Sequence, residues 1–114
     1  MNRSKPMNIG KLYQTKKYYW FLYPSKDIAV AALDPHLVAV VNAHGAAHPT
    51  HAFAKSFSAI YSERFNCNVS YIEPSIFCLL EKDGDFIKIL STNGEVGWIY
   101  LTDWCKNDIK EVNQ

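Results

Sequence analysis

Two tight-turn signals between short apolar runs constrain the fold of this 114-residue chain more than any other feature. Asp83-Gly84 separates the runs 76–80 and 86–90, and Asn93-Gly94 separates the second run from 96–101. Asp-Gly and Asn-Gly favour hairpins because tight turns that match the twist of strands need a positive φ. Three short strands bury too little area to be stable alone. The sequence therefore predicts a three-strand antiparallel meander that packs against the rest of the chain.

Composition indicates one globular domain with an uneven distribution of charge. Apolar residues make up 48% of the chain, which is enough for a packed core. The formal net charge is +1, but residues 1–26 carry six cations and no acid, whereas residues 71–114 carry eight acids and four lysines. Opposite charges favour association of the two segments within one domain. The alternative interpretation is a basic arm that binds nucleic acid or an anionic surface.

Cysteine usage and hydropathy favour a cytoplasmic protein. The three cysteines have no Cys-x-x-Cys spacing, and Cys78, inside an apolar run, is expected to be a small buried hydrophobe. A disulfide framework is not indicated, which favours a reducing compartment. No apolar stretch follows the basic N-terminus, and no run approaches the roughly 18 residues of a membrane span. Neither a signal peptide nor a membrane partner is expected.

The first quarter of the chain is dense in aromatic residues. Residues 1–8 are predicted to be a flexible tail and residues 9–114 a single domain. Aromatic side chains suit a half-buried pleated surface, so residues 10–23 are predicted to form one or two strands. The unbroken run 18–23 indicates burial on both faces, and Pro24-Ser25 ends it.

The sequence predicts a mainly helical segment over residues 26–66. Asp34-Pro35 is a helix-start signal, but the β-branched residues after it leave helix and strand open over residues 27–45. A clearer amphipathic helix follows a Thr50 cap and ends at Asn66. Its predicted apolar face consists of Phe53, Phe57, Ile60, Tyr61 and Phe65. We expect this face to dock within the same chain; a homodimer through it is the alternative.

Neither a metal site nor a catalytic centre is predicted. His44, His48 and His51 lie close together, with His36 upstream, but Gly45 and Pro49 interrupt any helix through them, and no Cys-x-x-Cys completes a ligand set. Cys67 and a histidine form a conceivable nucleophilic pair, yet no orienting third group is evident. The chain is therefore expected to be no enzyme and to use no cofactor.

The C-terminal motifs carry a family resemblance. They are Leu80-Glu81-Lys82 at a strand end, Gly84-Asp85 at a turn, Phe86-Ile87-Lys88, Gly97-Trp98-Ile99, and the helical turn Leu101-Thr102-Asp103-Trp104. This pattern resembles an SH3-like domain of the bacterial type, over roughly residues 69–112 plus a candidate first strand near 10–23. The resemblance implies a mainly β fold. It would be an SH3-like small barrel with a helical insertion, at about 26–66, between its first and second strands.

The resemblance also implies a function. Phe86 falls where signalling SH3 domains carry a ligand-contacting tryptophan, Tyr100 where they carry a groove proline, and Asp103 where they carry a groove tyrosine. The acidic stretch of their first long loop is replaced here by lysines and the insertion. The implied function is a non-enzymatic binding or assembly module with a protein or peptide partner and a specificity other than proline-rich motifs. Its expected aromatic face is Phe86, Tyr100, Trp104 and Trp98; core or rim packing is the alternative role for the two tryptophans.

A second hypothesis is a small barrel that binds nucleic acid. Lys11, Lys16 and Lys17 lie beside Tyr13, Tyr18 and Trp20, which is a composition suited to phosphate contact and base stacking. The sequence pI near 7.7 weighs against a dedicated nucleic-acid binder. Salt dependence separates the two hypotheses, because phosphate-driven binding weakens steeply as salt rises.

Overall fold

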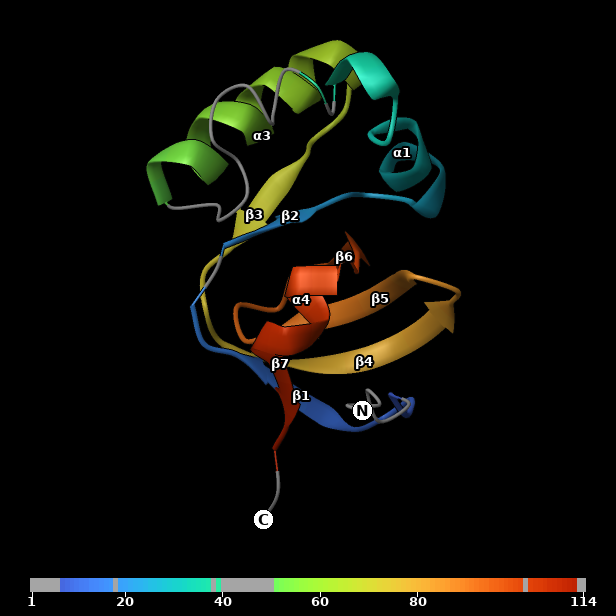
Figure 1. Ribbon diagram of the computed structural model, residues 1–114, viewed down its shortest axis with the longest axis vertical. Helices are drawn as coiled ribbons and strands as arrows, with labels where there is room; N and C mark the ends of the chain where they lie inside the picture. Colours follow the sequence, from blue (N-terminus) through green and yellow to red (C-terminus); the bar gives the residue numbers. More distant parts are fainter. Residues whose placement is uncertain (1–6, 18, 38, 40–50, 102, 113–114) are drawn as a thin grey trace.

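The computed structural model describes residues 7–17, 19–37, 39, 51–101 and 103–112 (Figure 1). The fold is mainly β, and its elements lie in three levels. A five-stranded sheet lies at one end, a two-stranded ribbon lies between, and two helices, Lys26–Ala31 and His51–Phe65, cover the ribbon (Figure 1). The sheet contains β1 (Leu12–Thr15), β4 (Ile76–Asp83), β5 (Phe86–Ser91), β6 (Val96–Tyr100) and β7 (Ile109–Glu111). The ribbon contains β2 (Trp20–Leu22) and β3 (Ser70–Ile72), and the helices are α1 (Lys26–Ala31), α3 (His51–Phe65) and α4 (Asp103–Asp108).

The predicted meander is confirmed. Strands β4, β5 and β6 pair antiparallel in sequence order, and β1 and β7 extend the sheet in the order β6-β5-β4-β1-β7. Gly84 and Gly94 both have positive φ, 61° and 83°, as the hairpin turns require. The first turn lies one residue later than predicted, because Asp83 still pairs with Phe86 and the turn residues are Gly84-Asp85. A bulge between Leu79 and Glu81 interrupts the β4–β5 ladder.

The strands do not form the expected closed barrel. The structure has two open sheets, which meet where Tyr23 and Trp98 exchange backbone hydrogen bonds of 2.8 and 2.7 Å. A barrel closes only when its first and last strands pair along their length. In the part of the chain that the structure describes, no such ladder joins β7 to the ribbon. The segment 10–23 is two strands, and they belong to different sheets.

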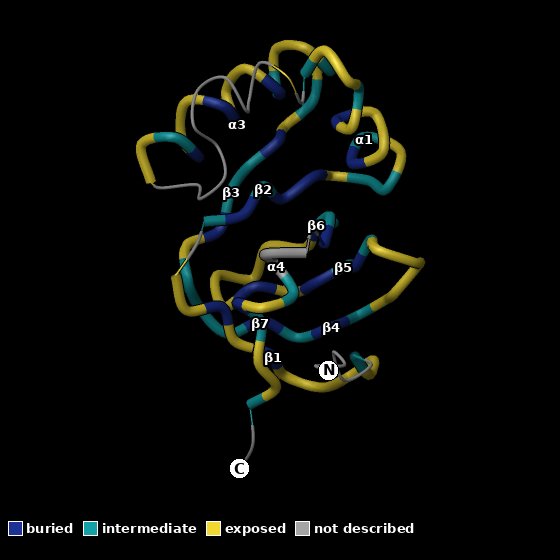
Figure 2. The backbone as a smooth tube through the Cα atoms, in the orientation of Figure 1, coloured by how far each residue is buried: buried dark blue, intermediate teal, exposed yellow. Residues whose placement is uncertain are grey.

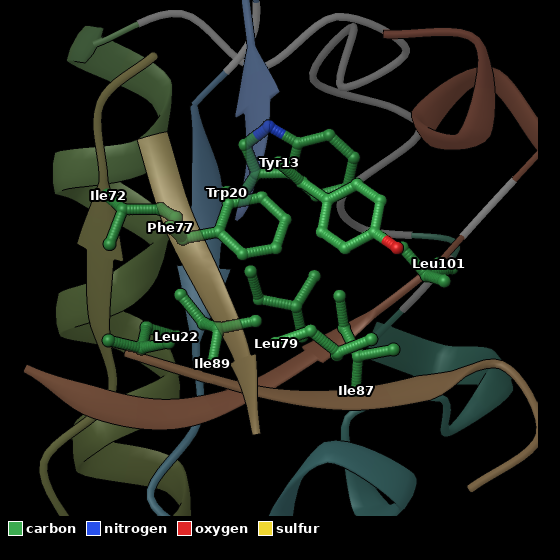
Figure 3. Close-up of a cluster of buried hydrophobic side chains, with 10 residues drawn as sticks. Tyr13, Trp20, Leu22, Ile72, Phe77, Leu79, Ile87, Ile89 and Leu101 are labelled. Carbon is green, nitrogen blue, oxygen red and sulfur yellow. The ribbon is translucent and has the colours of Figure 1, made fainter. Parts of the chain in front are cut away.

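A lower core fills the space between the five-stranded sheet and the ribbon (Figure 3). Phe77, Leu79, Ile87 and Ile89 line the sheet side and are at most 1% exposed. Along β6, Ile99 is buried as predicted, because alternation places Gly97, Ile99 and Leu101 inward. The ribbon contributes Trp20, Leu22 and Ile72 from its other side.

An upper core joins the opposite face of the ribbon to the helices (Figure 2). Phe57 and Tyr61 of α3 are buried in it, so the predicted docking of this helix within the chain is confirmed. Ile60 was wrongly placed on the docked face, since it is 48% exposed. The buried face is centred instead on Ala54, Phe57, Ser58 and Tyr61, and Ile60 lies roughly 120° away from that centre at 100° per residue.

Two predicted helix signals, Asn66 and Asp34-Pro35, are confirmed, whereas the start of α1 at Lys26 with Ser25 as its N-cap was not predicted. Asn66 has φ 50°, and the Asn66 and Cys67 amides donate to the carbonyls of Glu63 and Ser62, which is a Schellman cap. The predicted Thr50 cap lies outside the described residues. Residues 35–37 are helical, and the Asp34 carboxylate accepts a 2.8 Å hydrogen bond from the His36 amide, as the Asp-Pro signal predicts.

Polar contacts fix the two ends of the described chain. Residues 1–6 of the expected tail lie outside the described residues, whereas Met7 packs against the lower core and the Asn8 amide donates to the Tyr13 hydroxyl at 2.6 Å. At the other end, the buried Asp108 carboxylate accepts from the amides of Lys16 and Lys17 at 3.2 and 3.1 Å. Asp108 thereby ties α4 and β7 to the end of β1.

Candidate functional site

The structure brings two of the predicted site residues together. Phe86 and Tyr100 are opposite each other on β5 and β6, with ring centroids 5.1 Å apart and an interplanar angle of 39°. Both rings are on the outer face of the sheet, because their strand neighbours Ile87 and Ile99 point into the lower core. Both are half-buried, and Phe86 also packs against the cluster of the helices and the ribbon that includes Tyr23. The pair therefore forms a fixed apolar surface at the end of the meander.

Two ion pairs flank this aromatic pair. Lys26 of α1 forms an ion pair with Asp83, and its ammonium lies 5.8 Å from the centroid of the Phe86 ring. Lys106 of α4 lies 3.1 Å from Asp85. All four charged side chains are at least a third exposed, so each pair adds less than about 1 kcal/mol to stability. Their effect is to surround the two rings with charges of both signs.

The two predicted tryptophans do not complete the face as expected. Trp98 is half-buried and packs against the upper core, beside the backbone bridge to Tyr23. Part of the outer face of β6 is thus covered by the insertion, which favours the packing role for Trp98. Trp104 belongs to α4, and its side chain lies outside the described residues.

The basic segment has exposed lysines but buried aromatic rings. Lys11, Lys16 and Lys17 are exposed, and within the described part of the chain none of them forms an ion pair. Tyr13 and Trp20 are each 4% exposed in the lower core, so the expectation that they stack on bases is wrong. Tyr18 lies outside the described residues. The strand pattern places Tyr13 and Trp20 inward because each sits on the buried side of its sheet.

An aromatic cluster that the sequence did not predict joins the start of α3 to the ribbon. The His51 ring lies 5.4 Å from Tyr19 and 5.7 Å from Tyr71, measured between centroids, and His51 Nε2 is 3.1 Å from the Tyr71 hydroxyl. His51 itself is exposed. Its partners are Tyr19, the residue before β2, and Tyr71 of β3, which are far away in sequence, so no local pattern signals them.

The remaining histidines and cysteines form no larger cluster in the described residues. His44 and His48 lie outside them, and among the described residues no three His, Cys, Asp or Glu side chains could hold a metal ion. Cys67 and Cys78 are free and half-buried. Cys78 is more accessible than the buried hydrophobe that was expected, because it lies on the outer face of β4.

Two buried tyrosines have perturbed pKa values. Burial raises the pKa of Tyr61 from 10.0 to about 12. Burial and the nearby Tyr61 raise the pKa of Tyr23 further, with burial the larger cause. The rings pack together with centroids 6.1 Å apart. Both phenols stay protonated at neutral pH, so the pair belongs to the packing of the upper core.

Comparison with family models, with curated proteins and with solved structures finds no match to this chain. Among the described residues, no helix has the length and apolar character needed to cross a membrane.

Proposed function

We propose that this chain is a non-enzymatic, SH3-like binding or assembly module that takes a peptide or protein segment on the Phe86–Tyr100 pair. The observation that carries the proposal is the geometry of that pair, two half-buried rings held 5.1 Å apart on neighbouring strands. Rings fixed in this way offer apolar contact area at a low cost in conformational entropy. Recognition through aromatic ridges is a known mode of peptide binding.

The order of the elements supports the SH3-like assignment. The meander β4-β5-β6 is followed by the short helix α4 and then by β7, which pairs with β1. The helical segment lies between β2 and β3 in sequence, and therefore also separates β1 from β4. The free cysteines Cys67 and Cys78 are consistent with action in the reducing cytoplasm.

The charges around the Phe86–Tyr100 pair indicate which class of ligand would fit this site. Asp83 and Asp85 lie at one end of the site, with Lys26 and Lys106 beside them. An apolar side chain of the ligand would contact the rings, and a charged residue beside it would pair with the opposite charge of one of these exposed ion pairs. The ligand class is therefore a short extended segment with one apolar anchor and a neighbouring charge.

Selection from a displayed random-peptide library tests the proposal. We expect the wild-type chain to enrich peptides of the stated class, and Phe86→Ala and Tyr100→Ala to weaken their binding about tenfold or more, as loss of an aromatic hot spot does. Ile60→Ala is the matched control, because Ile60 is an exposed apolar residue on α3. Peptides that bind wild type and both ring variants equally would refute the aromatic site.

The exposed lysines support a second proposal, nucleic-acid binding at Lys11, Lys16 and Lys17. Contact there would be with phosphates alone, since Tyr13 and Trp20 are buried. Fluorescence polarisation with a single-stranded oligonucleotide tests it: affinity should fall steeply between low and physiological salt, and Lys16→Gln with Lys17→Gln should reduce the salt slope. Absence of binding at low salt would refute it.

A further inference from the structure

A group of three partly exposed rings lies where the ribbon meets the start of α3. The ring centroids of Tyr19, His51 and Tyr71 are 5.4, 5.7 and 6.1 Å apart. His51 is exposed, and the two tyrosines are half-buried. The 3.1 Å contact between His51 Nε2 and the Tyr71 hydroxyl fixes two of the rings relative to each other. These three residues are called the Tyr19–His51–Tyr71 cluster below.

The Tyr19–His51–Tyr71 cluster is suited to stacking with planar groups. Its rings are tilted by 36–56° to one another, so their faces point in several directions. The bases of a single strand can turn to meet such faces, because no complementary strand holds them. Stacking on an aromatic side chain requires only a π-face, which every base has. Unpaired nucleotides of any sequence therefore fit this cluster.

Lysines flank the cluster on two elements. Lys16 and Lys17 are exposed, and they precede Tyr19 by at most three residues, which span no more than about 11 Å. Exposed Lys55 lies four residues after His51 on α3, and residues four apart are neighbours on one face of a helix. The start of α3 lies beside the connection from β1 to β2 (Figure 1), and the contact of His51 with Tyr19 joins the two. The lysines therefore lie on both sides of the rings.

Acidic residues near the cluster do not offset these lysines. Glu73 is the only acid that lies within four residues of a cluster member in the sequence. Asp108 lies close to Lys16 and Lys17, but it is 7% exposed and its carboxylate accepts hydrogen bonds from their backbone amides. The exposed charge beside the rings is therefore mainly positive, which favours an anionic ligand.

We propose that single-stranded nucleic acid binds here, with its bases stacked on the Tyr19–His51–Tyr71 cluster and its phosphates on Lys16, Lys17 and Lys55. This inference rests on the nucleic-acid binding proposed above and adds the place where the bases are held. A duplex would contact only the lysines, because its bases are already stacked inside it. An acidic peptide would also contact the lysines, but it brings no planar group to the rings.

Fluorescence polarisation with two labelled probes of about ten nucleotides tests the proposal: oligothymidine, and the same backbone without bases. We expect the full chain to bind oligothymidine about tenfold more tightly than the abasic probe, as stacking of one or two bases would give. Tyr19→Ala and His51→Ala should each reduce this difference without changing the salt slope, since neither removes a phosphate contact. His51 is exposed, so His51→Ala tests stacking independently of any effect that Tyr19→Ala has on the fold. Ile60→Ala is the matched control, because it also truncates an exposed side chain on α3; it should bind both probes as the wild type does.

The lysine variants and the abasic probe separate this inference from the proposal on which it rests. Lys16→Gln with Lys17→Gln should weaken the binding of both probes and reduce the salt slope. If neither probe binds at low salt, nucleic-acid binding is refuted and stacking at the cluster with it. If the wild type binds both probes equally, or its preference for oligothymidine survives both ring variants, stacking at the cluster is overturned while phosphate binding by the lysines stands.

Discussion

Gly97→Ala should destabilise the fold by forcing the ribbon away from the large sheet. A Cβ at residue 97 would lie 2.6 Å from Leu22 Cγ, 2.8 Å from Leu22 Cδ1 and 2.8 Å from the Tyr23 carbonyl oxygen. Optimal contact between non-bonded carbons is about 3.5–4.0 Å. The Leu22 side chain has little room to move because it is 3% exposed, and the Tyr23 oxygen belongs to the backbone.

The magnitude follows from the contacts at this junction. Inserting a methyl group into a packed site costs about 1–3 kcal/mol. Separation of the strands also weakens the two Tyr23–Trp98 backbone hydrogen bonds, which contribute about 0.5–1.5 kcal/mol each. The expected loss is about 2–6 kcal/mol, a large part of the roughly 5–15 kcal/mol that stabilises a typical domain.

Urea denaturation followed by tryptophan fluorescence measures this loss. Val96→Ala is the control on the same strand, since Val96 is half exposed and its truncation should cost less than about 1 kcal/mol. Native-state amide exchange should also show faster exchange at Tyr23 and Trp98 in Gly97→Ala. A loss below about 0.5 kcal/mol with unchanged protection at both amides would refute the packing argument.

Three further predictions concern the two cores. Ile99→Ala should cost about 2–5 kcal/mol in denaturant melts, because Ile99 is 1% exposed in the lower core; a loss below about 0.5 kcal/mol would contradict that placement. The raised pKa of Tyr61 contributes stability that is fully present below pH 10 and is lost as the pH rises toward about 12. Over this pH interval the melting temperature of Tyr61→Phe should therefore fall less steeply than that of the wild type. Phe57→Asp should unfold the chain at all concentrations, since Phe57 is 6% exposed within the same chain; a folded, soluble monomer would contradict the docking of α3.

The parts of the fold that the sequence predicted are those specified by local signals. The meander follows from Gly84 and Gly94, whose positive φ values fix the two hairpins. The end of α3 follows from Asn66, which adopts the left-handed conformation of a helix cap. The inward position of Ile99 follows from strand alternation once the hairpin register is set.

The parts that were missed depend on contacts between distant segments. Strand β3 pairs with β2 across the whole insertion, with Trp20 opposite Ile72, and no local pattern encodes that pairing. The solvent exposure of Ile60 depends on which side of α3 meets the ribbon. The short strand β7 was not predicted, because its place is set by its pairing with β1.

Local signals predicted one part of the candidate site, and contacts between distant segments decide the other part. Strand register places Phe86 opposite Tyr100, so the hairpin signals were sufficient to bring these two rings together. Trp98 lies on the same face, but the insertion covers it, and the cover comes from residues far away in sequence. Likewise, alternation alone did not show which aromatic rings near Lys16 are buried, because β1 and β2 belong to different sheets.

Chemical-shift mapping during titration with a library-selected peptide tests most directly whether the chain binds through the aromatic pair. The largest changes should occur at Phe86, Tyr100 and the flanking Lys26 and Lys106, and they should disappear in Tyr100→Ala. The amides around Lys16 should not respond. Saturable shifts confined to the Lys16 region, or a peptide footprint unchanged by Tyr100→Ala, would contradict binding at the Phe86–Tyr100 pair.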